Sequence, residues 1–295
     1  MKPLLFLFRV AFCLAAALGV AAAEDAKSGV GERMFVIGAS ASAGFIQEEL
    51  LGGMKTPEYR LKYYLDAALS TPHEPAGSSC TSMFFLAVQP SAKTQIASAV
   101  AAKPTLTVSV DFLFWFCYGR LKEEPARLAL LEKGLAHLEK IPGTIVVGDL
   151  PDATSAIGKI LDREEVPKVE TIAAANRRIR EWAAARPSVI VLPLSEFMAT
   201  CKADKAVKCG PVEWPDGKTR ALLQADELHA SQSGNAALAL SVFAALTERG
   251  LVPKESVLWD AEAVKAKAIA NSQPEKDALK ARIETKEVVP LIESK

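Results

Sequence analysis

Residues 33–44 read RMFVIGASASAG, a short apolar segment that runs directly into glycine, alanine and serine. An apolar run of this length, ended by small residues, predicts a buried strand. The small residues that follow predict a tight turn from the strand into a helix. Ser40 lies in the middle of this predicted turn.

The rest of the chain alternates between the two kinds of element. Further strands are expected at residues 105–110, 145–148 and 188–192, and helices around residues 57–69, 92–102, 123–140, 172–185 and 233–249. Alternating strands and helices form right-handed βαβ units, which build a parallel sheet covered on both faces. Such sheets carry their working residues at the carboxyl ends of the strands. The sequence thus predicts one main α/β domain.

Two segments depart from this alternation. Residues 71–79 are rich in proline, glycine and serine, and we expect them to form a loop. Residues 256–295 are rich in lysine, glutamate and alanine, with Pro274 among them. We expect the main domain to span residues 24–255, and residues 256–295 to be a helical C-terminal extension that packs on it or forms a mobile tail.

The composition is that of a folded globular protein. Half of the 295 residues are hydrophobic, which is enough for a sizeable core. The charged fraction of 24% is ordinary and excludes wholesale disorder. Lys and Arg together number 35, as do Asp and Glu. The balance therefore gives no sign of a nucleic-acid partner.

The first 23 residues have the pattern of a secretory signal peptide. Lys2 and Arg9 precede an apolar stretch, and three alanines stand before Glu24. An uncleaved membrane anchor is the alternative, but the apolar run after Arg9 is short for a membrane span. We expect cleavage, export to the periplasm or the extracellular space, and no stable membrane span afterwards. Removing two positive charges leaves 33 positive and 35 negative side chains, a net charge of −2.

Export changes the interpretation of the cysteines. Beyond the signal peptide there are four, Cys80, Cys117, Cys201 and Cys209, which allow three pairings. Because Cys201 and Cys209 flank a polar, lysine-rich loop, we expect them to pair and leave Cys80 to pair with Cys117. Four free buried thiols are the alternative, which an oxidising compartment disfavours. Their spacing does not indicate a metal site.

Ser40 is a candidate nucleophile. A serine in a strand-to-helix turn among small residues exposes its hydroxyl, and backbone N–H groups at a helix start can stabilise an oxyanion. Considered alone, the stretch is better explained as an ordinary small-residue turn or a helix N-cap. The segment lacks the G-x-G-x-x-G spacing of a dinucleotide-binding loop.

His229 is the second candidate for chemistry. Residues 226–234 read DELHASQSG, and Asp226 precedes His229 by three residues just before a predicted helix. In such a turn the Asp can accept a hydrogen bond from one imidazole nitrogen, which leaves the other to take a proton from a hydroxyl. The alternative is that Asp226 caps a loop and His229 lies on the surface. His73 and His137 lie in a proline-flanked loop and a predicted helix, where no such arrangement is expected.

Together these segments resemble the SGNH (GDSL-like) hydrolase family, over about residues 35–250. The resemblance is carried by VIGASAS (residues 36–42) and DELHASQSGNAALA (residues 226–239). It implies a three-layer α/β/α flavodoxin-like domain with a mainly parallel sheet. It also implies Ser40 as nucleophile, His229 as general base and Asp226 as the carboxylate that orients it, with no cofactor or metal ion.

The chain departs from the family pattern around the expected oxyanion hole. Ala39 stands where the family has the Asp of G-D-S, and Asp111 ends the strand where the family has an Asn. An ionised Asp cannot donate a hydrogen bond to an oxyanion. By the resemblance, the backbone N–H groups of Ser40 and Gly77 are the expected donors. Losing one oxyanion donor typically costs about 10²–10³ in rate, so we expect a slower but active enzyme.

Two further clusters follow predicted strands. Residues 111–118, DFLFWFCY, form the most aromatic stretch, and Asp111, Phe112 and Trp115 are candidates for the wall of a substrate pocket. A buried core segment is the alternative. Residues 148–152, GDLPD, bring two carboxylates to the same rim, either to bind a cation or substrate hydroxyls or simply to form a turn.

These observations predict an exported serine hydrolase that cleaves carboxylic esters of small molecules or carbohydrates. Two alternatives remain open. One is an acyltransferase or carbohydrate deacetylase on the same scaffold. The other is a non-catalytic module that binds envelope polysaccharide.

Overall fold

The apolar segment at residues 33–38 forms β1 in the computed structural model, which describes residues 29–287. The sheet that contains it has five strands in the order β2-β1-β3-β4-β5, and every neighbouring pair is parallel. This is the flavodoxin-like strand order. The strands are β1 (Arg33–Gly38), β2 (Glu74–Cys80), β3 (Leu106–Ser109), β4 (Thr144–Gly148) and β5 (Val189–Leu192).

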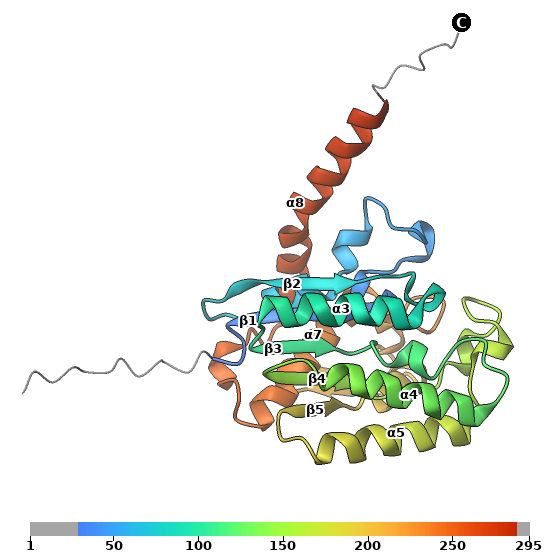
Figure 1. Cartoon of the computed structure of the whole chain (residues 1–295). Helices are drawn as coiled ribbons and strands as arrows, with labels where there is room; N and C mark the ends of the chain where they lie inside the picture. Colours follow the sequence, from blue (N-terminus) through green and yellow to red (C-terminus); the bar gives the residue numbers. More distant parts are fainter. Residues whose placement is uncertain (1–28, 288–295) are drawn as a thin grey trace, which may run out of the picture.

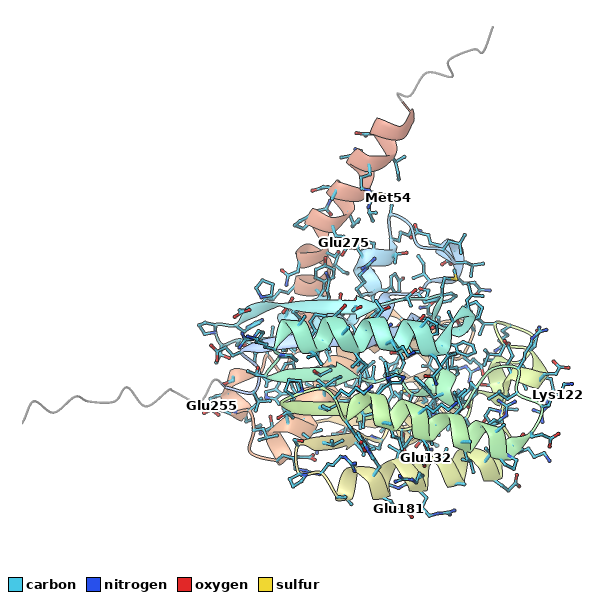
Figure 2. All side chains as sticks on the ribbon, viewed as in Figure 1. Met54, Lys122, Glu132, Glu181, Glu255 and Glu275 are labelled. Atoms are coloured by element: carbon cyan, nitrogen blue, oxygen red, sulfur yellow. The ribbon has the colours of Figure 1, made fainter. Side chains whose placement is uncertain are left out.

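Helices cover both faces of the sheet, so the expected three-layer α/β/α fold is confirmed (Figure 1). One face packs against α3 (Val88–Ala102), α4 (Glu124–Leu138) and α5 (Val169–Ala184). The other packs against α2 (Leu61–Ala68) and α7 (Gln232–Glu248), and α8 (Ala261–Glu287) packs on these two helices. Figure 2 shows Glu132 and Glu181 on the outer side of α4 and α5, and Glu132 accepts hydrogen bonds from Arg178 there.

Side chains alternate between two hydrophobic cores along each central strand. Met34 and Val36 of β1 belong to the core under α2 and α7, whereas Phe35 and Ile37 pack on the core under α3 and α4. The same alternation continues in β4, where Val146 faces the first core. Because both faces are covered, these strands are mostly apolar, as the sequence predicted.

Shorter elements connect these layers at the carboxyl ends of the strands. They include α1 (Ser40–Ala43), α6 (Leu194–Lys202) and a hairpin of β6 (Val207–Cys209) and β7 (Val212–Trp214). The 3₁₀ helices are η1 (Gln47–Glu49), η2 (Thr56–Tyr59), η3 (Phe84–Leu86), η4 (Phe114–Phe116), η5 (Thr154–Ala156), η6 (Arg163–Glu165), η7 (Arg220–Leu222) and η8 (Lys254–Ser256).

The strand β2 is the main difference from the expected elements. Its sequence, EPAGSSC, has the composition of a loop, and residues 71–79 were expected to form one. The segment is an edge strand that pairs with β1 alone. Edge strands tolerate proline and need few apolar residues, because one side has no ladder to complete. The prediction of a loop there was therefore wrong.

The C-terminal helix α8 is anchored along its first half. Val264 and Ala268 are fully buried in the core under α2 and α7. Glu275 then accepts a 2.6 Å hydrogen bond from Tyr63 and lies 3.1 Å from Arg60. Beyond this contact the helix extends away from the domain (Figures 1 and 2). Within residues 29–287, no helix is long and apolar enough to cross a membrane. The expected signal peptide, residues 1–23, lies outside the described residues.

The four cysteines do not form the expected disulfides Cys80–Cys117 and Cys201–Cys209, and all have free thiols. Cys80 packs against the core under α2, while Cys117 is buried in the core on the other side of the sheet. The sheet therefore separates the first pair. Cys201 and Cys209 share one core, but the Sγ of Cys209 lies 3.0 Å from the hydroxyl of Ser241 instead. Burial raises the pKa of Cys201 to about 12 and that of Cys209 to about 11.

A buried arginine holds the loops beyond β3 and β4 together. Arg127 of α4 is 2% exposed, and its guanidinium donates to the carbonyl oxygens of Cys117, Gly119 and Glu164 at 2.8–2.9 Å. Arg127→Met should lower the free energy of unfolding by about 3 kcal/mol, because it leaves buried carbonyl groups without donors. Urea unfolding measures this change.

Arg178→Met is the matched control for that substitution. Arg178 pairs with Glu132 on the protein surface, and both side chains are partly exposed to solvent. Loss of an exposed pair should cost less than about 1 kcal/mol. Equal effects of the two substitutions would contradict a structural role for the buried guanidinium.

Candidate active site

The serine turn begins where β1 ends. Gly38 is the last residue of the strand, and Ser40 is the first residue of the four-residue helix α1. Cys80 ends β2 directly beside Gly38, and the two strands stop at the same edge of the sheet. The hydroxyl of Ser40 is therefore presented at the carboxyl edge, where the fold places its working residues.

The histidine lies on a loop that leads into α7. The backbone N–H groups of Leu228 and His229 both donate to Oδ1 of Asp226 at 3.0 Å. Glu227, which lies between Asp226 and Leu228, has a φ of 58°, in the left-handed region, and this lets the chain turn back on itself. The D-x-x-H spacing therefore closes a local turn in which one carboxylate oxygen holds the backbone and the other is free for the imidazole.

The three predicted residues form one hydrogen-bonded chain. Nδ1 of His229 lies 2.7 Å from Oδ2 of Asp226, and Nε2 lies 2.8 Å from Oγ of Ser40. An ionised carboxylate can only accept, so Nδ1 carries the proton and Nε2 accepts from the Ser40 hydroxyl. Ser40 and His229 are 189 positions apart in the sequence, so this contact is wholly a product of the fold.

Asp226 stays ionised although it is almost completely buried. Burial acts to raise the pKa of this carboxyl, but the hydrogen bonds from the imidazole and the backbone of His229 outweigh it, and the pKa lies below its usual value. A carboxylate held this way fixes the tautomer and orientation of the imidazole, and it stabilises the imidazolium when it forms.

Phe45 supports the imidazole from the other side, and the sequence did not indicate it. Its ring stacks on that of His229 with a centroid separation of 4.0 Å and an interplanar angle of 26°. Its carbonyl accepts a 2.8 Å hydrogen bond from Gln224, which also donates to Ala230. Phe45 directly follows Gly44, the glycine that ends the serine turn. This closeness in sequence to Ser40 is the one feature that could have predicted its position near the site.

Asp111 lines the pocket beside Ser40, and its carboxylate is hydrogen-bonded to the serine turn. Its carboxylate accepts from the N–H of Ser42 at 3.1 Å and from the hydroxyl of Ser42 at 2.5 Å, and it is also hydrogen-bonded by the amides of Ala39 and Ala41. Burial raises its pKa, and these hydrogen bonds oppose the rise. The residue at the position of the family's Asn therefore anchors the turn that carries Ser40.

Gly77 lies too far along β2 to reach the serine turn. It pairs with Phe35 in the middle of the strand ladder, and a Cβ at this position would be 2.7 Å from the Phe35 ring. The strand continues to Cys80, so at about 3.3 Å per residue Gly77 is about 10 Å from the carboxyl end. Because Gly77 has no Cβ, it leaves room for a phenylalanine of the neighbouring strand.

The aromatic run after β3 serves mainly as core. Phe112 is fully buried and packs edge-on against Phe84 at 5.6 Å. Trp115 contacts Phe85 and Phe114, and it does not line the pocket beside Ser40. Phe114, between the two predicted wall residues, is the aromatic ring of this run that does line the pocket.

An apolar pocket opens beside Ser40 and His229. Its wall combines the serine turn with side chains from the loop after β4, from α6, from the loop before His229 and from α7: Leu150, Pro151, Leu194, Phe197, Met198, Leu223, Leu228 and Leu238. The helix α6 was not expected from the sequence, so neither were its three pocket residues. No group of three or more His, Cys, Asp and Glu side chains in the described part of the chain could hold a metal ion.

Asp149 lines the pocket, but its carboxylate is held by hydrogen bonds within the fold. Its carboxylate accepts from the N–H and the hydroxyl of Ser195, both at 2.7 Å, and so holds the first turn of α6. Burial raises its pKa, and these two hydrogen bonds oppose the rise. Asp152 caps its own turn by accepting from Thr154. Of the two interpretations of residues 148–152, the turn accounts for Asp152, whereas Asp149 is held by α6.

The contact between Gly38 and Asp111 gives a test of the anchored turn. A Cβ at residue 38 would be 2.0 Å from Oδ1 of Asp111 and 2.6 Å from Oγ of Ser42. Gly38→Ala should therefore displace the carboxylate and lower the free energy of unfolding by about 3 kcal/mol, at the upper end of what overpacking costs. Gly29→Ala is the control, because a Cβ there meets no atom within 4 Å. Equal thermal unfolding of the two variants would contradict this account.

No protein-family model matches the chain, and no curated protein matches it by sequence. Among solved structures, a lipase/acylhydrolase from Enterococcus faecalis is 19% identical, with a TM-score of 0.48 over 78% of this chain and 98% of that one. An acetylxylan esterase from Geobacillus stearothermophilus is 17% identical, with a TM-score of 0.46 over 77% of this chain and 98% of its own. A lipase from a goat rumen metagenome is 13% identical, with a TM-score of 0.43 over 72% of this chain and 96% of its own.

Proposed function

We propose that this protein is a serine esterase of the SGNH (GDSL-like) type. The observation that carries the proposal is the chain of hydrogen bonds from Ser40 through His229 to Asp226 at the carboxyl edge of the sheet. The family assignment is supported by the flavodoxin-like strand order together with the chain order of the three residues, serine after β1 and D-x-x-H before α7.

The geometry suits acyl transfer through a covalent intermediate. Ser40 Oγ attacks the ester carbonyl carbon while Nε2 of His229 takes its proton, and Asp226 stabilises the resulting imidazolium. The imidazolium then donates that proton to the alkoxide as the C–O bond of the ester breaks. A water molecule, deprotonated by the same nitrogen, cleaves the acyl-enzyme and releases the carboxylic acid and free Ser40.

The oxyanion of the tetrahedral intermediate has only one assigned hydrogen-bond donor. The amides of Ala39, Ala41 and Ser42 are directed at Asp111, which leaves the Ser40 N–H as the donor that we assign from the serine turn. Gly77 is not part of this assignment, because it lies inside β2. A missing donor costs about 10²–10³ in rate, so we expect a modest turnover number.

The compartment is proposed from the first 23 residues alone. A basic start, an apolar stretch and small residues before Glu24 indicate a cleaved signal peptide and export to the periplasm or extracellular space. The substrate would then be an ester that occurs outside the cytoplasm. The completed hydrogen-bonded chain favours a catalyst over a non-catalytic polysaccharide-binding module, because binding alone requires no aligned nucleophile and base.

Replacement of the nucleophile is the first test. Ser40→Ala should abolish hydrolysis of p-nitrophenyl esters and labelling by a fluorophosphonate probe, because it removes the hydroxyl that forms the covalent bond. Ser42→Thr is the companion variant, because it keeps a hydroxyl group at residue 42 that can donate to Asp111, and it leaves Ser40 unchanged. Undiminished turnover in Ser40→Ala would refute the assignment.

Replacement of the orienting carboxylate is the second test. Asp226→Asn should lower kcat by about 10⁴ with little change in KM, because the amide no longer holds the imidazole in the required tautomer. Asp152→Asn changes an exposed acid on the same edge of the sheet and should leave kcat unchanged. Steady-state kinetics on one p-nitrophenyl ester compares the three proteins, and equal kcat values would show that Asp226 has no such role.

A further inference from the structure

The pocket beside Ser40 offers a substrate almost no free polar group. Of its polar side chains, Ser40 and His229 belong to the proposed triad, Asp111 is held by Ser42, and Asp149 is held by Ser195. The remaining wall is aliphatic or aromatic. A sugar ring bound there would leave its hydroxyl groups without partners, which costs free energy, whereas an alkyl chain would gain by leaving water.

A second cavity lies behind one wall of this pocket. The two cavities share Phe197 of α6 and Leu238 of α7 as lining residues. The second lies between α6, the β6–β7 hairpin and α7, and apolar side chains such as Val207 and Ala245 line it together with polar ones such as Thr200. Phe197 is half-buried, whereas Leu238 is almost completely buried in the core. Phe197 therefore lies between the two cavities, and it can be shortened with less damage to the core than Leu238.

We propose that the pocket binds the alkyl chain of the acyl group of the ester, and that Phe197 sets the longest chain that fits. The inference rests on the proposed esterase function and adds the class of substrate, esters of unbranched fatty acids. The acyl carbon is the one bonded to Ser40 in the covalent intermediate, and the alcohol must leave to solvent after His229 protonates it. An apolar pocket next to Ser40 thus suits the part of the substrate that stays.

The test is a series of p-nitrophenyl esters from acetate to dodecanoate, in which only the acyl chain changes. For the wild-type protein, kcat/KM should rise about fourfold for each added methylene until the pocket is filled, and then fall. Phe197→Ala opens the way to the second cavity and should move the maximum to chains about two to four carbons longer. Phe197→Trp fills more of the same space and should move the maximum to shorter chains.

Phe85→Ala is the matched control, because Phe85 is an exposed phenylalanine that lies against Trp115 and lines neither cavity. Its chain-length profile should coincide with that of the wild type. Circular dichroism checks that each variant is folded, and the opposite shift in Phe197→Trp keeps the test decisive if Phe197→Ala does not fold.

Three results would overturn the inference. The first is a maximum of kcat/KM at the acetate ester for the wild-type protein. The second is a maximum at an unchanged chain length in both Phe197 variants. The third is that kcat/KM depends on the length of the alcohol chain and not of the acyl chain, measured with acetate esters of increasing alcohol length. Ser40→Ala separates this failure from failure of the esterase itself. If turnover requires Ser40 and the chain-length profile is insensitive to residue 197, the acyl pocket and the role of Phe197 are contradicted, but the esterase function is not. If no ester is turned over, or turnover survives Ser40→Ala, both proposals fall.

Discussion

The buried carboxylate of Asp111 is the constraint on which the candidate site depends. It joins the end of β3 to the first turn after β1, through the amide and the hydroxyl of Ser42. A buried carboxylate is costly unless it is fully hydrogen-bonded, so the turn must keep the geometry that brings these donors to it. Ser40 lies within this turn, and its position at the edge of the sheet follows from that geometry. Gly38 completes the arrangement, because any larger residue would occupy the space of the carboxylate.

The other half of the site is held by contacts among segments far apart in the chain. His229 is fixed by Asp226 within its own loop, but the stacked Phe45 comes from the loop after α1. That loop leads into η2, where Glu58 accepts from Gln232 of α7 at 2.8 Å and pairs with Lys276 of α8. The C-terminal helix thus braces the segment that carries Phe45. The extension was expected either to pack on the main domain or to form a mobile tail, and its first half packs on the domain.

The sequence was informative wherever a local pattern carried the information. The strands at residues 33–38, 145–148 and 188–192 and the five expected helices all exist in the structure, because buried parallel strands and helix boundaries leave strong local signals. β2 was missed because an edge strand needs no apolar run, and α6 was missed because its few residues follow directly on Pro193. The pair Cys80–Cys117 was wrong for a similar reason, since spacing along the chain does not reveal which face of the sheet a cysteine occupies. Cys201 and Cys209 share one core, but their thiols are free.

By itself the sequence determined the local chemistry: the small-residue turn that presents Ser40 and the D-x-x-H turn in which one carboxylate holds both backbone and imidazole. These arrangements span only a few residues, so their geometry follows from backbone dihedral angles and short-range hydrogen bonds. Only the tertiary structure decided that Asp111 anchors the turn, that Gly77 stays inside a strand, and that Phe114 and Phe197 line the pocket. Those outcomes depend on which segments pack together, and close packing between distant segments leaves no pattern in either one alone.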